Sequence, residues 1–264
     1  MKVTHDFHIH TNLSLCAEKD ATVEYYVRKA EEIGLTKIGF SNHFWDSAIE
    51  GANGFYRPQN WEHVKQLRAE LEQVKSKTER IYFGCEAEYD PVHHGVAMSE
   101  ETAEKFDYIL VPNSHTHMMM PKECYKPYQK HADFMVQAYA DILNSSVSRY
   151  ITAMAHPFEA VCCPYDYSIL IDIISDDTFK RLFDQTAEKE IAVEINIGKF
   201  RDSKAEDIET CSQIRMFRIA KECGCKFIFG SDAHNRKRHD LYGYTDVFAD
   251  ILELKEHDIA EIAR

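Results

Sequence analysis

The chain has 264 residues, of which 44% are hydrophobic and 28% charged, as in a large globular domain. Its formal net charge of −13 argues against a nucleic-acid backbone or an anionic membrane as the main partner, but it permits a small anionic substrate. No run has transmembrane length, and the N-terminus has no apolar signal core. With eight cysteines that form no disulfide or zinc-ribbon pattern, we expect free thiols and a cytoplasmic location.

Short strand-like runs alternate with longer helix-like stretches. Strands are expected at residues 3–8, 37–40, 80–85, 108–111, 151–155, 191–197 and 226–230. Helices are expected at residues 22–33, 61–77, 130–144, 177–189 and 207–223. Several strands are continuous apolar runs, which is typical of a sheet covered on both faces. The alternation predicts one α/β domain over residues 1–264, with seven parallel strands closed into a barrel.

The first helix has clear end signals. Asp20 or Thr22 is suited to open it as an N-cap, and Gly34 follows it as a C-cap. Two loops interrupt the later pattern, at residues 44–59 and 118–129. Each follows a histidine of interest, so we expect both loops to lie at the rim of a site.

Histidines stand at the ends of most predicted strands, and two acids occupy similar places. The histidines are His8, His10, His43, His115, His117, His156 and His234, and the acids are Glu86 and Asp232. In a parallel barrel the carboxyl ends of the strands lie at one rim, so these side chains are expected to meet. Imidazole and carboxylate groups bind divalent transition metals. The sequence therefore predicts a metal site.

The spacing of these residues along the strands indicates which of them are the better candidates for metal ligands. Residues two apart on a strand point to the same face, so His8 and His10 can reach one ion. Glu86 is favoured as an acid that bridges two ions, with Glu88 as its rival on the same face.

The pair after the fourth predicted strand also shows a two-residue spacing. His115 is favoured as a ligand over His117 because it lies nearer the strand. His117 is then expected to support a ligand or to touch the substrate.

The segments HIHTNLS, SNH, GCE, NSH, AHP and SDAH together resemble the polymerase-and-histidinol-phosphatase (PHP) superfamily of metal-dependent phosphoesterases. The resemblance covers nearly the whole chain, with the motifs in the family's order. GCEAEYDP, VEINIGKFR and GSDAHNRK resemble its histidinol-phosphatase branch. The resemblance implies a distorted TIM-like (β/α)7 barrel with three divalent metal ions. Histidine-rich ligation with carboxylates fits zinc, manganese or iron alike.

Three ligand sets follow from the resemblance. They are His8, His10, Glu86 and Asp232 for the first ion, Glu86, His115 and His156 for the second, and His43 and His234 for the third. One more ligand for the third ion is expected from the segment after His10. Family members commonly have Asp or His there, whereas this chain reads LSLCAEKD. Cys16 falls nearest to the expected position, and Glu18 and Asp20 are the alternatives.

The resemblance implies hydrolysis of a small phosphate monoester by a metal-activated hydroxide, with histidinol phosphate as one candidate substrate. Asp232 and His234 are the expected proton-transfer groups. The alternatives are a nuclease-type phosphodiesterase and an amidohydrolase-like enzyme that use the same metal site.

Contacts to the substrate are harder to assign. Arg201 is the favoured phosphate contact because a guanidinium group binds phosphate through two hydrogen bonds, and Lys199 and Arg236 are weaker candidates. Glu194 is expected to recognise a substrate amine or to support a metal ligand.

Overall fold

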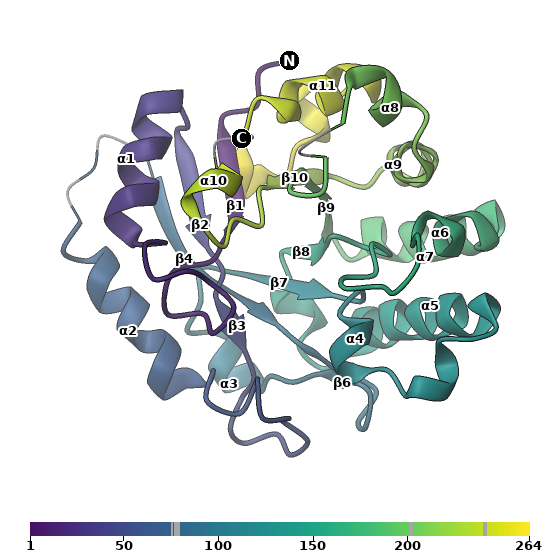
Figure 1. The fold of residues 1–264 in the computed structure, drawn as a ribbon, viewed down its shortest axis with the longest axis horizontal. Coiled ribbons are helices and arrows are strands. Elements are labelled where there is room, and N and C mark those ends of the chain that lie inside the picture. Colours follow the sequence, from purple (N-terminus) through teal and green to yellow (C-terminus); the bar gives the residue numbers. More distant parts are fainter. Residues whose placement is uncertain (75, 77–79, 201–202, 240–241) are drawn as a thin grey trace.

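The structure is a computed structural model that describes residues 1–74, 76, 80–200, 203–239 and 242–264. Parallel strands lie at its centre in the order β1-β2-β4-β7-β8-β9-β10, with helices around them (Figure 1). They are β1 (His5–Ile9), β2 (Lys37–Phe40), β4 (Arg80–Ala87), β7 (Tyr108–Pro112), β8 (Ala153–Ala155), β9 (Ala192–Asn196) and β10 (Phe227–Gly230). The short β3 (His43–Phe44) pairs with β4, and β5 (Tyr89–Asp90) pairs antiparallel with β6 (Gly95–Val96). The predicted α/β barrel is confirmed.

The barrel is nearly closed where β1 meets β10. A parallel bridge joins Ile9 to Ala233, just beyond the end of β10. Side chains of β1 complete this seam, because Asp6 Oδ1 accepts a hydrogen bond of 3.0 Å from the backbone N–H of Ser231. His5 accepts another from the backbone of β10. The first and last strand ends are thereby fixed beside each other.

Tyr108 fills the barrel interior. Its hydroxyl donates a hydrogen bond of 2.9 Å to the carbonyl of Phe7, on a strand that does not neighbour its own. The tyrosine ring occupies the space that a Cβ on Gly39 or Gly84 would need. Glycine at these two positions therefore lets β2 and β4 pass close to the ring.

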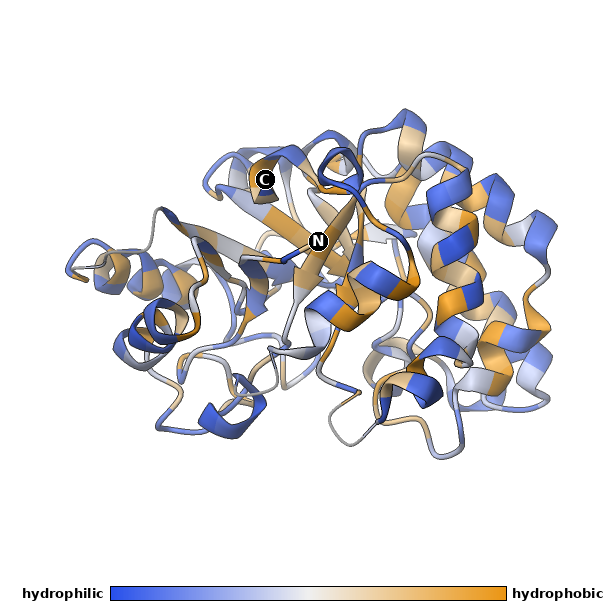
Figure 2. Cartoon of the chain, turned by 90° about the horizontal axis from the view of Figure 1, so that it is seen from above, coloured by the Kyte–Doolittle hydropathy of each residue, from blue (hydrophilic) through white to orange (hydrophobic). Residues whose placement is uncertain are grey.

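The helices cover the outside of the barrel. The long ones are α1 (Val23–Ile33), α2 (Trp61–Leu71), α5 (Tyr128–Asn144), α7 (Asp176–Glu188) and α9 (Ser212–Glu222). The short ones are α3 (Glu100–Ala103), α4 (Thr116–Met119), α6 (Ser168–Ile173), α8 (Ala205–Glu209), α10 (Arg236–His239) and α11 (Tyr244–Ile251). Figure 2 shows apolar residues on the central strands and on one side of the surrounding helices. One apolar core runs from Val3 to Ala263.

Most predicted elements lie within a few residues of their expected bounds, and the end signals of the first helix are confirmed. The side chain of Thr22, rather than that of Asp20, accepts a hydrogen bond from Tyr25 N, and Gly34 adopts a left-handed backbone with φ of 79°. The helix predicted at 61–77 ends at Leu71, and residue 77 lies outside the described residues.

The helix predicted at 207–223 is wrong as a single element. It is divided between α8 and α9, because Cys211 has an extended backbone with ψ of 150° that a helix cannot continue through. Apolar periodicity alone does not register such a one-residue break.

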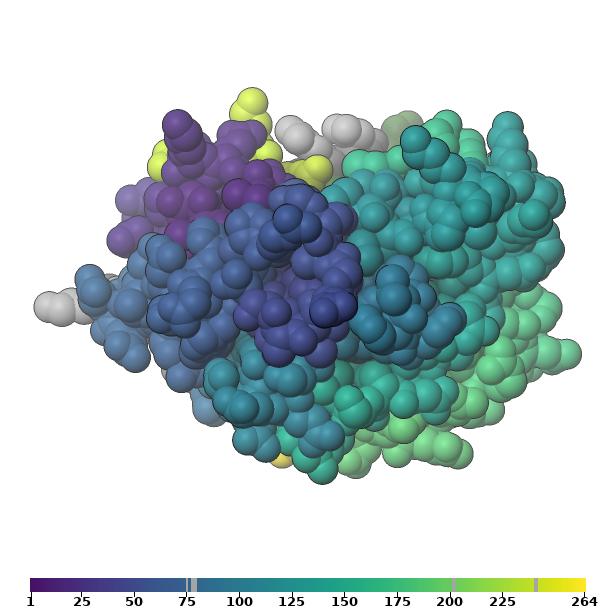
Figure 3. Space-filling view, turned by 90° about the horizontal axis from the view of Figure 1, so that it is seen from below, coloured from purple at the N-terminus to yellow at the C-terminus, as the bar shows by residue number. Residues whose placement is uncertain are grey.

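The loop after β3 packs as a separate small apolar cluster. Trp45 and Tyr56 contact Ala97, and Asp46 N donates a hydrogen bond of 2.9 Å to Ala97 O. In Figure 3 this dark blue segment lies between lighter blue and teal residues from later in the sequence. Among the described residues, no helix combines the length and apolar character needed to span a membrane.

We predict that Gly84→Ala destabilises the fold by about 1–3 kcal/mol, because the added methyl group overlaps the Tyr108 ring. Urea unfolding measures this change. Gly54→Ala is the matched control, since no atom lies within 4 Å of a Cβ built there. Equal stability of the two variants would contradict the close approach of Tyr108 to β4.

Candidate metal centre

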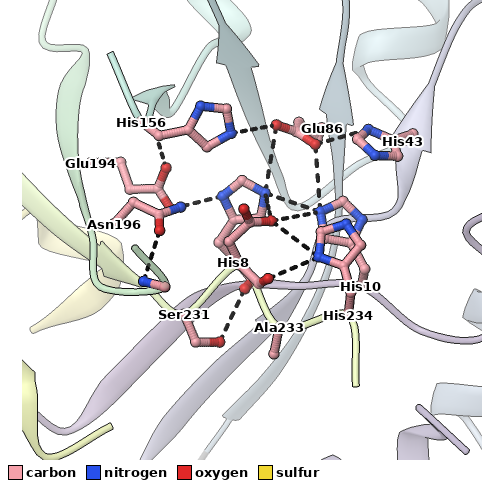
Figure 4. A network of polar contacts seen from close by, with 12 residues as sticks. His8, His10, His43, Glu86, His156, Glu194, Asn196, Ser231, Ala233 and His234 are labelled. Atoms are coloured by element: carbon pink, nitrogen blue, oxygen red, sulfur yellow. Dashed lines mark hydrogen bonds and ion pairs between the residues drawn. The ribbon is translucent and has the colours of Figure 1, made fainter. Parts of the chain in front are cut away.

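The side chains at the strand ends meet around Glu86 at one end of the barrel (Figure 4). Glu86 is only 1% exposed. Its Oε1 lies 3.0 Å from His156 Nε2 and 3.5 Å from His115 Nε2. Its Oε2 lies 2.9 Å from His43 Nδ1. One carboxylate therefore faces imidazoles that come from three different strand ends.

A second cluster lies where the end of β1, with His8 and His10, meets the loop after β10, with Asp232. His8 Nε2 and His10 Nε2 are only 3.1 Å apart. Asp232 Oδ1 lies 3.5 Å from the first of these nitrogens and 3.4 Å from the second. Both nitrogens also lie within 3.6 Å of Glu86 oxygens, so the two clusters are continuous.

Acids behind two of the histidines fix which nitrogen carries the proton. Glu194 Oε1 lies 2.7 Å from His8 Nδ1, and Glu88 Oε2 lies 2.7 Å from His115 Nδ1. A carboxylate only accepts hydrogen bonds, so each Nδ1 carries a hydrogen, and in the neutral ring each Nε2 has a lone pair that faces the centre. This arrangement is typical of histidines that bind a metal.

Serines lie behind two further histidines. Ser14 Oγ donates to Asn42 Oδ1 at 2.9 Å, so it is free to accept from His10 Nδ1 at 3.1 Å. Ser114 Oγ lies 2.6 Å from His156 Nδ1. The Nε2 atom of His10 thus also presents a lone pair to the centre.

This arrangement fits metal ions. Two imidazole nitrogens that face each other at 3.1 Å beside two carboxylates need a proton or a metal ion between them, and a metal ion can also bind the carboxylates. Among the described residues, Glu86 Oε2 and His43 Nδ1 are buried without a hydrogen bond of good geometry. Groups of metal-ligand atoms lie within 4.8 Å of one another in four overlapping sets, and these sets contain every predicted ligand.

The electrostatics of the centre also favour a cation. Burial alone would lower the pKa of His8, but the charges of Glu194, Glu86 and Asp232 outweigh burial and raise this pKa well above its usual value. Burial would raise the pKa of Glu86, but His115 and His8 hold it well below its usual range. Carboxylates that stabilise a protonated imidazole stabilise a metal ion in the same place.

Two candidate ligand positions have unusual backbone conformations. His156 has φ of 25° and Asp232 has φ of 50°, both in a region that side-chain-bearing residues seldom adopt. Glu194 Oε2 accepts a hydrogen bond of 2.6 Å from His156 N and so holds the first of these turns. Such strain is common at functional sites.

Glu194 lies behind the histidines and not in the pocket. It is 0% exposed, and its two oxygens contact His8 and His156. Of the two roles left open by the sequence, the structure favours support of a ligand over recognition of a substrate amine. Glu88 is likewise behind His115, which leaves Glu86 at the centre.

Two of the predicted basic residues, Lys199 and Arg236, do not line the pocket. Arg201 lies outside the described residues. Lys199 Nζ donates to Glu159 O at 2.6 Å. Arg236 lies 3.3 Å from Asp20 and packs over the Tyr25 ring. These contacts turn the last two cations toward the protein.

Arg238 is the pocket cation that the sequence did not identify. It lines the pocket, and its Nη1 donates to Asp232 O at 3.4 Å. The basic run NRKRH indicated that a cation could lie near the site. The sequence does not show which of Arg236 and Arg238 faces the pocket, because this depends on how α10 is oriented.

A pocket of about 360 Å³ opens above the centre. Its lining combines the candidate ligands with apolar and polar groups from several loops: Cys16, Glu18, His43, Phe55, Tyr56, His115, His117, Met118, Val161, Cys162, Asp232, His234, Asn235 and Arg238. Burial and the charge of His115 lower the pKa of His117 to about 4, so this histidine is neutral at pH 7.

Comparisons with known proteins agree with this geometry. A model of the PHP domain matches residues 6–198. The chain is 23% identical over 234 residues to a candidate phosphatase of Clostridium novyi (strain NT), which covers 89% of this chain and 80% of that protein.

Two solved structures have a similar fold. One is histidinol phosphate phosphatase from Lactococcus lactis, complexed with zinc, L-histidinol and phosphate, with a TM-score of 0.61, 17% identity and coverage of 94% of this chain and 93% of that chain. The other is a candidate histidinol phosphatase from Listeria monocytogenes, with a TM-score of 0.69, 15% identity and coverage of 92% and 99%. The family model spans well over half of the sequence, and the chain therefore belongs to the PHP domain family of phosphoesterases.

Proposed function

We propose that this PHP-domain phosphatase hydrolyses small phosphate monoesters with divalent ions held around Glu86. The observation that carries the proposal is the convergence of imidazole lone pairs on two buried carboxylates, with His8 Nε2 and His10 Nε2 only 3.1 Å apart. Such a group requires positive charge, and a phosphate ester is the kind of anion that this charge would bind.

The ligand sets follow the geometry. His8, His10 and Asp232 form one group, and Glu86 lies within reach of it and of His43, His115, His156 and His8. We propose three ions, of zinc, manganese or iron. Bound divalent ions would supply an activated water and neutralise the charge on the phosphoryl group.

Asp232 and His234 are the proposed proton-transfer residues. Their side chains are 17% and 18% exposed, whereas those of His8 and His10 are fully buried. Exposure to the pocket allows these two groups to exchange protons with the substrate or with water.

The pocket walls suit a small leaving group. Phe55, Met118 and Val161 contribute apolar surface to the lining, and Glu18 contributes a carboxylate. An amino-bearing leaving group with an apolar part would fit this lining. Because the Lactococcus lactis relative was crystallised with L-histidinol and phosphate, histidinol phosphate is the first substrate to assay.

Metal-loaded protein should release phosphate from histidinol phosphate or another small monoester and should leave single-stranded oligonucleotides uncut. The buried cluster would bind the ions that activate water. The net charge of −13 would repel a polyanion such as an oligonucleotide. A panel of monoesters, oligonucleotides and cyclic amides, assayed with verified metal content, measures this selectivity.

Glu86→Gln is the site control in the same assay. It should lose bound metal, and its phosphate release should fall further than the roughly 10–100-fold drop expected for Glu88→Gln, which acts through His115. Phosphate release absent across the panel, or cleavage confined to oligonucleotides or amides, would overturn the proposed function.

We propose that Arg238, which lines the pocket, contacts the phosphoryl group. Arg238→Ala should then lower kcat/KM by about 10–100-fold, because this charge-assisted hydrogen bond is lost. Arg236→Ala is the matched control, two residues away on the same helix but paired with Asp20. It should stay within about twofold of the unaltered protein, as is usual for an exposed ion pair. Both variants should keep their metal content, and equal kinetics of the two would remove Arg238 from the proposal.

A further inference from the structure

We infer that Cys16 binds the third metal ion together with His43 and His234, and that this position selects thiophilic divalent ions such as Zn²⁺ or Co²⁺ over Mg²⁺, Mn²⁺ and Ca²⁺. The inference rests on the proposed metal centre and specifies the class of ion that one of its positions takes. It concerns this chain's own departure at a position where the resemblance implied Asp or His.

The geometry places the thiol among imidazoles. One ligand atom from each of His10, Cys16, His43 and His234 lies within 4.8 Å of the other three. Zinc binds nitrogen at about 2.0–2.1 Å and sulfur at about 2.3 Å, so ligand atoms around it are about 3.3–3.8 Å apart. Small side-chain adjustments would bring the ligand atoms of Cys16, His43 and His234 to that spacing.

His10 also belongs to a second group of possible metal ligands. Its Nε2 lies 3.1 Å from His8 Nε2 and 3.4 Å from Asp232 Oδ1, in the neighbouring group. A single imidazole nitrogen binds one ion, so His10 serves that group. Cys16, His43 and His234 remain. His43 also belongs to the group of Glu86 and His115, but the ion beside Glu86 Oε1 keeps His115 and His156 without it. Three ligands are the arrangement of a catalytic zinc site, which leaves one position for water or substrate.

Backbone contacts hold the thiol in place. Glu18 N donates a hydrogen bond of 2.9 Å to His234 O, which ties the loop after β1 to the loop after β10. His234 Nδ1 lies 2.8 Å from Asp232 O, so this nitrogen carries the hydrogen and Nε2 keeps its lone pair. Cys16 lines the pocket, where an ion can reach it.

The kinds of ligand atom around Cys16 determine which metal ions this position prefers. Among the described residues, carboxylates take part in the other three groups through Glu86 or Asp232, and the group around Cys16 holds none. Asp20, one predicted alternative, is paired with Arg236, and Glu18 lines the pocket outside the group. Mg²⁺ and Ca²⁺ require oxygen ligands, and Mn²⁺ prefers them, whereas thiolate and imidazole suit Zn²⁺ and Co²⁺.

Cobalt substitution tests the inference without turnover. The Co²⁺-loaded protein should show a thiolate-to-cobalt charge-transfer band in the near ultraviolet, and Cys16→Ser should lose it. Cys162→Ser is the matched control, because Cys162 is an exposed thiol that lines the same pocket but lies outside the ligand group. This control should keep the band.

Metal content gives the second readout. Cys16→Ala should bind one zinc ion fewer per chain, and Cys16→Asp should restore the ion while shifting the position toward Mn²⁺. A missing charge-transfer band, or a band that survives in Cys16→Ser, would overturn the inference. A Cys16-dependent band without phosphate release would overturn only the proposed function, and phosphate release without the band would overturn only the inference.

Discussion

A buried carboxylate surrounded by imidazole lone pairs is the constraint on which this structure depends. Glu86 is almost fully buried, and burying a charge without compensation costs several kcal/mol. Protonated histidines or metal ions can supply the compensation. Acids behind His8 and His115 hold a hydrogen on the outer nitrogen of each ring, which orients the inner nitrogen toward the centre in the way that metal-binding histidines are oriented.

The way the barrel closes brings these side chains together at one end. The seam between β1 and β10 is closed by side chains such as Asp6, and it brings the loop of Asp232 beside the end of β1. Tyr108 fixes the interior by bonding across to Phe7. Asp232, at the end of this seam, has a left-handed backbone, a form of local strain that is common at functional sites.

The strands and the histidine cluster could be predicted from the sequence because both follow simple rules. Apolar runs mark buried strands, and parallel strands place their ends at one rim. The break at Cys211 could not be predicted, because a helix on each side of it keeps the same apolar periodicity. Apolar periodicity indicates which face of a helix is buried, but it does not indicate that one residue within the run has an extended backbone.

Side-chain direction also escaped sequence reasoning. Glu194 and Arg238 required knowledge of which way each side chain points, and the sequence fixes this only through tertiary packing. The first lies behind the histidines, and the second faces the pocket while its neighbour Arg236 does not. Likewise, Cys16, Glu18 and Asp20 share one loop, and only their contacts distinguish them.

The most direct test of the metal centre is anomalous diffraction from crystals grown with saturating zinc or manganese. Strong peaks should lie between His8 Nε2 and His10 Nε2, beside Glu86 with His115 and His156 turned toward the ion, and between His43 and His234. Well-ordered crystals in which these positions show no anomalous signal would contradict the account at its root.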